Sequence, residues 1–164
     1  AFAAHHVRIG RITSASLALL SAVEIPATEG FSAVVQVEQE GYTLIFARGG
    51  EPVLHRYKPF TGGMPDASHA GYVTRDLKLT RNFLDENFPG SALGPVLLLA
   101  PPEVEQDWME RLREGLGGNT GGQGTLSILP IDGRALPSLR SEDPVAPPWR
   151  EIAPMLGAVR QEVA

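Results

Sequence analysis

The sequence predicts an α/β fold in which an antiparallel meander of three strands is continued by parallel strands with crossover helices. Two observations lead to this expectation. Residues 31–60 contain three apolar segments joined at glycines, and residues 94–102 form a continuous apolar run flanked by two segments with helical periodicity. The order of elements is therefore β-β-β-α-β-α-β, preceded by one further strand and helix.

The meander is the clearest local pattern in the chain. Its strands run from Ala33 to Glu38, from Tyr42 to Ala47 and from Val53 to Phe60. Glycine occurs in both connections, Glu40-Gly41 and residues 48–51. It supplies the positive φ that short hairpin turns require. We expect the three strands to pair antiparallel in sequence order.

A broad amphipathic helix is predicted after the breaker cluster at residues 61–68, with Asp66 or Ser68 as its N-cap. At 100° per residue the apolar side chains of this helix fall in two adjacent rows, and polar side chains fill the opposite arc. One row contains Tyr72, Leu79 and Phe83, and the other contains Val73, Leu77, Leu84 and Phe88. We expect both rows to be buried.

The run GPVLLLAPP at residues 94–102 shows no alternation, which is typical of a parallel strand covered on both faces. Pro101 and Pro102 end this strand. The next segment, from Glu103 to Leu116, has apolar residues at the spacing of a helix. They are Val104, Trp108, Leu112 and Leu116. TLSILPI at residues 125–131 is predicted to be the last strand.

The beginning of the chain predicts a strand and a short helix. Residues 5–13 alternate loosely between apolar and polar side chains, and residues 17–23 are apolar nearly all round. Thr13 or Ser14 can cap this helix, which we expect to be buried on most sides.

Four stretches follow from these patterns. Residues 1–30 lead in, residues 31–132 form the main domain, residues 133–150 are a proline-rich connection, and residues 151–164 form a C-terminal helix that packs back. Two right-handed crossovers onto a sheet that begins with a meander define the ribonuclease-H-like arrangement, which is also that of half an actin-like ATPase.

Composition excludes several classes of function. The 164 residues carry a formal charge of −5 and no cysteine. Disulfides, thiolate catalysis and cysteine-ligated zinc are therefore excluded, and the acidic balance argues against a nucleic-acid partner. The longest apolar runs, residues 17–23 and 96–100, are too short to cross a bilayer, so we expect a soluble chain.

Two further patterns do not favour a ligand site. The glycine-rich residues 115–124 contain no lysine and lack the GxxxxGK[ST] order of a phosphate-binding loop, so a mobile loop is expected there. The histidines lack the helical i, i+4 pairing of a metal site, and no metal is expected. They are His5, His6, His55 and His69.

Several strings resemble one protein family. VVQVEQEGYTLIFARGGEPVLHRYKPF fits a hairpin frame of the actin-like cytoplasmic proteins of type IV pilus assembly and type II secretion platforms, the PilM and GspL group. TRDLKLTRNFLDENF resembles the long helix of that family, and APPWREIAPMLGAVRQEV resembles its closing segment. HHVRIGRITSASLALLSAVEI resembles the end of a preceding lobe. The resemblance implies an actin-like lobe.

The chain departs from the family at the positions that would hold a nucleotide. Gln36 stands at the family's Asp, Glu38 at its hairpin Gly and Thr43 at its Thr, while Pro101-Pro102 replaces a Gly-Gly turn. Glycines let backbone N–H groups approach phosphates, and the acid holds Mg²⁺. A carboxylate at Glu38 and two imino acids favour neither contact. These positions are degenerate, which is typical of a pseudo-ATPase without a cofactor.

Residues alone leave two interpretations of Gln36 and Glu38 open. They are the remnant of a nucleotide site, or they face solvent on a half-exposed strand.

The family resemblance implies a non-catalytic scaffold or docking module at the cytoplasmic side of the inner membrane, held there by partners. These partners would be the cytoplasmic tail of a membrane platform protein and a motor ATPase. The alternatives are an ATP-binding actin-like protein with an atypical site, an isolated binding module of unknown partner, and a ribonuclease-H-like nuclease. The nuclease would need a carboxylate where Gln36 stands, with Glu38 or Glu40 as substitutes.

Overall fold

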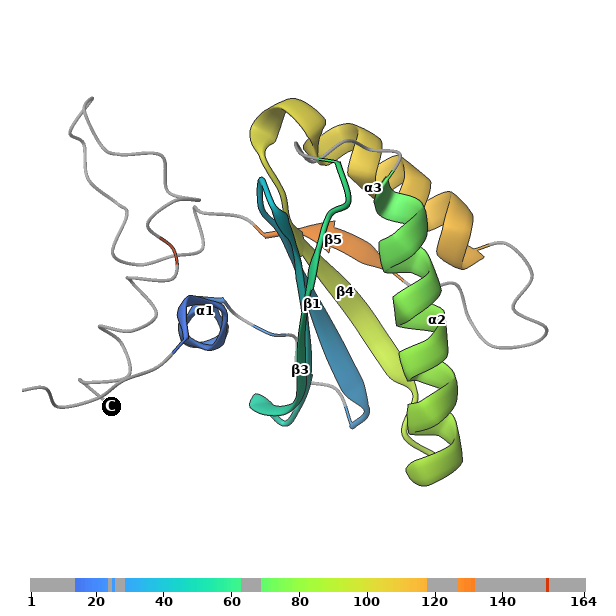
Figure 1. Cartoon of the computed structure of the whole chain (residues 1–164). Helices are drawn as coiled ribbons and strands as arrows, with labels where there is room; N and C mark the ends of the chain where they lie inside the picture. The colour runs from blue at the N-terminus through green and yellow to red at the C-terminus, as the bar shows by residue number, and fades with distance from the viewer. Residues whose placement is uncertain are drawn as a thin grey trace, which may run out of the picture.

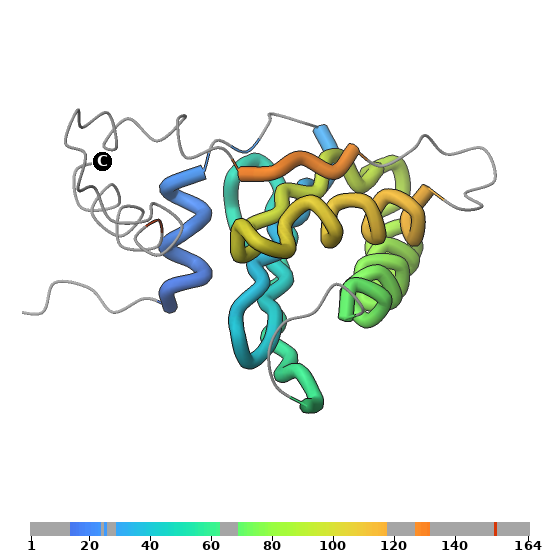
Figure 2. Tube along the Cα trace, turned by 90° about the horizontal axis from the view of Figure 1, so that it is seen from above, coloured from blue at the N-terminus to red at the C-terminus, as the bar shows by residue number. Residues whose placement is uncertain are grey.

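The protein is a three-layer α/β structure in which one sheet separates a single helix from a pair of helices (Figure 1). In the computed structural model, the described residues are 14–23, 25, 29–62, 69–117, 127–131 and 153. Helix α1 (Ala15–Ala22) lies on one face of the sheet, and helices α2 (Ala70–Asn87) and α3 (Pro102–Gly117) cover the other. The view from above shows the same separation (Figure 2).

The sheet has five strands in the order β3-β2-β1-β4-β5. The strands are β1 (Phe31–Val37), β2 (Gly41–Arg48), β3 (Glu51–Pro59), β4 (Leu93–Leu99) and β5 (Ile128–Pro130). The first three pair antiparallel in sequence order, and β4 and β5 continue the sheet in parallel with β1. The predicted meander and parallel continuation are confirmed, although β5 is shorter than the predicted strand at residues 125–131.

The two hairpin turns use glycine for different reasons. Gly49 and Gly50 have φ of 58° and 85°, as the sequence predicts for the turn between β2 and β3. Gly41 is not among the glycines with positive φ, so that part of the prediction was wrong. A Cβ at Gly41 would lie 2.4 Å from the carbonyl oxygen of Lys58, so glycine there permits the close approach of β3.

Helix α2 buries one of its two predicted apolar rows. Val73, Leu77 and Leu84 belong to the core against the sheet. Tyr72, Leu79 and Phe83 are 62%, 54% and 50% exposed, so the expectation that both rows are buried was wrong. The helix has His69 at its N-cap, and the predicted caps Asp66 and Ser68 lie outside the described residues.

Helix α3 closes the same face beside α2. Trp108, Leu112 and Leu116 are buried as predicted, with Val104 packed partly against them. The helix continues to Gly117, so the first residues of the predicted glycine-rich loop are helical instead. A Cβ at Gly115 would lie 2.6 Å from Thr74 Cγ2, and glycine thus allows α3 to pack closely on α2.

On the other face, α1 begins after Ser14, whose hydroxyl caps it by accepting from the N–H of Leu17 at 3.2 Å. Buried leucines of α1 pack with Val34, Ile45 and Leu97 of the sheet, which confirms the expected burial of this helix. None of the helices in the described parts of the chain has the length and hydrophobicity needed to span a bilayer.

The predicted strand at residues 5–13 and the connection at residues 133–150 lie outside the described residues. Of the predicted C-terminal helix, only Ala153 is described, and it is buried with the core around α1.

Candidate functional site

The fold brings the five predicted nucleotide positions to one end of the sheet. Gln36 is paired with Thr43 across the β1–β2 hairpin and lies beside Leu99 in the parallel register with β4. The carboxyl ends of strands β1 and β4 therefore lie side by side, where Glu38 follows β1 and Pro101-Pro102 follows β4. In open α/β sheets, ligands bind outside the carboxyl ends of the strands, so this end of the sheet is the candidate nucleotide site.

Gln36 and Glu38 interact with each other at this end of the sheet. The Gln36 side-chain amide donates a hydrogen bond from Nε2 to Glu38 Oε1 at 2.8 Å. Gln36 is only 7% exposed and its Oε1 accepts no hydrogen bond from the described residues, whereas Glu38 is exposed. The interpretation that both residues face solvent therefore holds for Glu38 and is wrong for Gln36.

Thr43 lies beside Gln36 on the face of the sheet that α1 covers. Its side chain is buried, and its Oγ1 accepts a hydrogen bond from Ser16 Oγ of α1 at 3.5 Å. The threonine hydroxyl thus contacts the helix.

The end of β4 offers few donors to an anion. Pro102 is the first residue of α3 and has no N–H, and the N–H of Val104 is already bonded to the carbonyl of Pro101 at 3.1 Å. Glu103 and Glu105 stand in the first turn of α3. A helix N-terminus attracts anions through its N–H groups and positive dipole end, and two carboxylates oppose that attraction. The roles of these positions toward nucleotide stay predictions.

A second polar cluster lies between β2, β3 and α2. Asp76 of α2 is buried and accepts hydrogen bonds from Tyr42 Oη and Lys58 Nζ, each at 2.8 Å. Lys58 also forms an ion pair with Asp76, at 2.6 Å between Nζ and Oδ2. The cluster connects α2 to the adjacent strands β2 and β3.

Burial and charge act in opposite directions on the Asp76 carboxyl. Burial by itself raises the pKa of Asp76, but the hydrogen bonds from Lys58 and Tyr42, with the charges of Lys58 and Arg56, lower it below its ordinary value. The pKa of Tyr42 is raised above its ordinary value by burial and by the hydrogen bond and negative charge of Asp76. Asp76 is therefore a carboxylate held in its charged form, and Tyr42 stays a donor.

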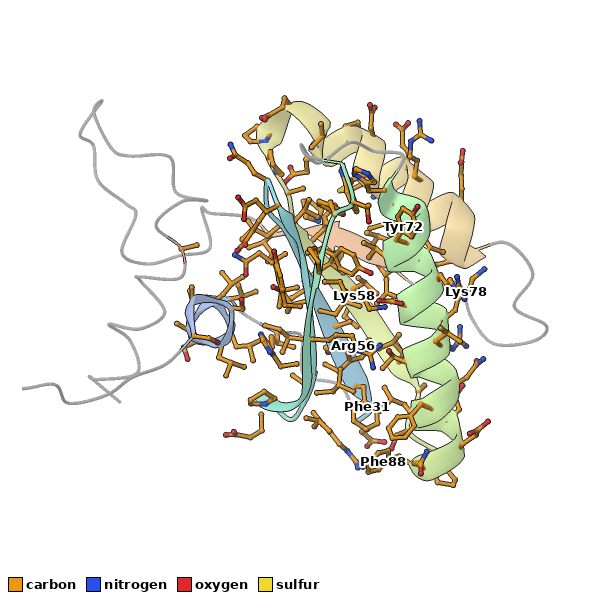
Figure 3. All side chains as sticks on the ribbon, in the orientation of Figure 1. Phe31, Arg56, Lys58, Tyr72, Lys78 and Phe88 are labelled. Carbon is orange, nitrogen blue, oxygen red and sulfur yellow. The ribbon has the colours of Figure 1, made fainter. Side chains whose placement is uncertain are left out.

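A cavity of about 320 Å³ opens beside this cluster. It is lined by Tyr42, Lys58, Pro59, Phe60, Thr61, Tyr72, Arg75, Asp76 and Leu79. Figure 3 shows Lys58 and Arg56 of β3 extending toward α2, while Lys78 projects from the far side of that helix. The lining of the cavity therefore combines the cationic side chains of Lys58 and Arg75 with Tyr72 and Leu79 of the exposed row of α2.

Sequence reasoning missed the Asp76 cluster. Asp76 lies between Tyr72 and Leu77 in the apolar part of the helix, four residues after Tyr72 and three after Val73. An acidic residue inside an apolar arc needs a partner, and that position was the available signal. The partners come from other strands, and only the fold brings them near.

Among the described residues, no group of three or more His, Asp or Glu side chains is arranged to hold a metal ion.

No protein-family model matches the chain, and no curated protein matches it by sequence. Solved structures do match. The chain is similar to a structure of the PilM–PilN type IV pilus biogenesis complex, with a TM-score of 0.58 and 15% identity. This match covers 94% of the chain and 52% of the matched chain.

Two further solved structures resemble the chain. One is a protein of unknown function with an actin-like ATPase fold from Bacteroides thetaiotaomicron, with a TM-score of 0.48, 11% identity, and coverage of 86% of this chain and 41% of that one. The other is the ethanolamine utilization protein EutJ from Carboxydothermus hydrogenoformans, with a TM-score of 0.41, 12% identity, and coverage of 71% and 49%.

The chain spans about half the length of these proteins or less. It has the fold of an actin-like, ribonuclease-H-like lobe, and the predicted fold class is confirmed.

Proposed function

We propose that the chain is a non-catalytic docking module in a bacterial inner-membrane platform for type IV pilus assembly or type II secretion. The likeness in fold to PilM in its complex with PilN supports this proposal. The local strings that resemble the PilM and GspL group support it independently, because they were identified in the sequence alone.

One observation carries the non-catalytic part of the proposal. The end of the sheet where a nucleotide would bind presents the exposed carboxylate of Glu38 and the imino acids Pro101 and Pro102. A triphosphate there would meet negative charge and would lack the N–H donors that glycines expose. In this proposal the lobe keeps its shape for binding and performs no hydrolysis.

The partners are proteins. In the proposal, the lobe binds the cytoplasmic tail of a membrane platform protein and contacts the motor ATPase, and these contacts hold it at the cytoplasmic side of the membrane.

A binding assay with a platform tail tests this proposal. A fluorescent synthetic peptide with the sequence of the cytoplasmic tail of the PilN-like protein from the same genome is titrated with the chain. We expect saturable binding with a Kd of about 1–100 μM in fluorescence anisotropy. A scrambled tail of the same composition is the control. Equal signals from both peptides, or none up to about 1 mM, would refute the platform assignment.

A genetic test addresses the lack of catalysis. A strain that lacks the gene should lose pili or secretion, and a Gln36→Ala, Glu38→Ala double variant should restore them to the wild-type level. Failure of this variant to complement, at normal protein abundance, would indicate that the sheet edge acts in chemistry.

One observation favours an ATP-binding protein with an atypical site as the second candidate. Gln36 Oε1 is buried at the candidate site and has no donor among the described residues, and a bound ligand could supply one. Titration with ATP and Mg²⁺ separates the two candidates.

A further inference from the structure

The outer edge of β3 is the feature that the proposed function leaves unused. Strand β3 is the last strand on its side of the sheet, and no described segment pairs with its outer edge. An exposed strand edge offers a row of N–H and C=O groups to another chain. Edge pairing of this kind is a common mode of peptide recognition.

The register identifies the backbone groups that point outward. The N–H of Phe60 donates to the carbonyl of Glu40 at 2.7 Å, so Phe60 faces β2. The backbone N–H and C=O groups of successive residues alternate in direction along an antiparallel strand. Those of Lys58 and Arg56 therefore also point to β2, while those of Tyr57 and His55 point away from the sheet. The N–H that Pro59 lacks falls on the outer side as well, so that proline removes no bond from the sheet.

The charge beside this edge is positive, although the chain as a whole is acidic. Arg56 and Lys58 of β3 and Arg75 of α2 lie around the cavity or next to it, and Asp76 is the one carboxylate among the described residues that line it. Lys58 and Tyr42 already bind Asp76. Neither Arg56 nor Arg75 forms an ion pair with another described residue. The charge around the cavity is therefore complementary to an anionic ligand.

Apolar side chains flank the same edge on both faces. Tyr72 and Leu79 of α2 line the cavity, and both are more than half exposed. On the opposite face of the sheet, Tyr57 of β3 is 48% exposed, and Val53, at the irregularity near the start of the same strand, is equally exposed. A strand placed next to β3 would cover apolar surface on either side.

We propose that an extended acidic segment of a partner protein binds here as an additional strand on β3. Its backbone pairs with the outward groups of His55 and Tyr57. Its carboxylates lie on the α2 side, near Arg56, Lys58 and Arg75, and its alternate apolar side chains cover Tyr57 on the other face. Opposite charges on neighbouring strands favour this pairing.

The same charges argue against a second copy of this chain as the occupant. Pairing of two β3 edges would place the Arg56 and Lys58 rows of both copies next to each other. Like charges on neighbouring strands are unfavourable. An acidic segment meets no such repulsion.

The test uses a defined probe. An acetylated and amidated peptide in which Glu and Val alternate over about seven residues is titrated into the 164-residue chain and followed by NMR and fluorescence anisotropy. We expect saturable binding, with shifted amide resonances confined to β3 and the facing side of α2. A peptide with Lys in place of Glu should bind about tenfold more weakly or not at all.

Matched variants separate charge from strand pairing. Arg56→Glu combined with Arg75→Glu should weaken binding at least about tenfold, whereas Lys78→Glu, on the far side of α2, should leave it within about twofold. His55→Pro removes one outward N–H and no bond within the sheet, so it should also lose about tenfold, while His55→Ala retains binding.

N-methylated peptides give the same test without changing the protein. Methylation of the peptide amides that face β3 should abolish binding by the wild-type chain, and methylation of the alternate amides should not.

Four results would overturn the proposal. They are absence of binding, equal binding of the Lys peptide, equal binding by His55→Pro and His55→Ala, and concentration-dependent self-association of the chain that Arg56→Glu abolishes. The last result would assign the edge to a second copy. None of these measurements depends on the platform tail, so this proposal and the proposed function can fail separately.

Discussion

The side-chain amide of Gln36 donates one hydrogen bond and accepts none from the described residues. Its Nε2 donates to Glu38, but its Oε1 is buried without a donor among the described residues. A buried acceptor without a partner costs free energy that an apolar side chain of similar shape does not. We therefore expect Gln36→Met to leave the free energy of unfolding unchanged or to raise it by about 1 kcal/mol, as measured by urea unfolding.

The control for Gln36→Met is Glu40→Ala, at an exposed position of the same hairpin turn, which should change stability by less than about 0.5 kcal/mol. A loss of more than about 2 kcal/mol in Gln36→Met would show that the amide makes a stabilising contact outside the described residues.

Asp76 should make stability depend on pH. Folding lowers its pKa below the ordinary 3.8, so the unfolded chain takes up the proton at a higher pH than the folded protein does. The stabilisation is present above about pH 3.8 and is lost as the pH falls through the lower pKa of the folded state. Asp76→Asn should cost about 1–2 kcal/mol at neutral pH and progressively less in acid, measured by urea unfolding.

Asp85→Asn is the matched control for this pH dependence. Asp85 lies on the same helix and forms only a partly exposed pair with Arg81 at 3.8 Å. A stability difference between wild type and Asp76→Asn that stays constant from neutral to acid pH would contradict the assigned role of the carboxylate.

At the residue scale, the sequence indicated which residues lie at the candidate site better than it indicated how buried each one is. It indicated both Gln36 and Glu38 as nucleotide positions, and the structure adds that they form a hydrogen bond, with Glu38 just after the end of β1. It did not separate the buried amide from the exposed carboxylate, because strand alternation gives both residues the same face. Gln36 lies between Thr43 of β2 and Leu99 of β4, and the parallel neighbour β4 lies far along the sequence.

Helix α2 distinguishes a buried row from an exposed one at the scale of the element. Leu77 is fully buried against the sheet, whereas Leu79 is 54% exposed beside the cavity. We expect Leu77→Ala to lower the free energy of unfolding by about 2–5 kcal/mol, because it leaves a cavity in the core. Leu79→Ala should change it by less than about 0.5 kcal/mol in the same urea titration.

Similar losses from Leu77→Ala and Leu79→Ala would mean that the outer row of α2 is covered in the folded chain. That result would also remove the apolar flank of the β3 groove.

The order of elements followed from the sequence, whereas some turn residues and the exposure of helix faces did not. Apolar periodicity predicted α2 correctly, but a helix cannot reveal where the sheet beneath it ends. The row containing Tyr72, Leu79 and Phe83 is exposed because β3 is the edge strand on that side. Gly41 was expected to have positive φ, and its reason is instead the adjacent carbonyl of Lys58.

At the scale of the whole molecule, the order of elements was sufficient to predict the topology. A meander followed by two crossovers has few arrangements that obey the rules for connections, so the strand order could be derived without knowledge of any contact. The Asp76 cluster could not be derived in this way. It joins β2, β3 and α2 through Tyr42 and Lys58, and their proximity is a result of the fold.

Restoring the family residues at the nucleotide positions tests which of the substitutions prevents ATP binding at the end of the sheet. The double variant Gln36→Asp, Glu38→Gly returns the acid and the hairpin glycine but leaves Pro101 and Pro102. We expect no ATP binding by this variant in calorimetry, because the second side of the site still lacks donors. Further replacement of both prolines by Gly should give measurable binding.

Tight binding by the double variant alone would show that Pro101 and Pro102 are no obstacle. Unfolding of the fourfold variant by circular dichroism would indicate that the prolines are needed to begin α3.

The most direct measurement of the proposed lack of nucleotide chemistry is isothermal titration calorimetry of the wild-type chain with ATP and Mg²⁺. We expect only heats of dilution up to about 1 mM nucleotide, since Glu38, Glu103 and Glu105 oppose the phosphates. Saturable binding with a Kd of about 1–10 μM, weakened by Gln36→Ala, would contradict the docking-module proposal and establish the chain as a nucleotide-binding protein.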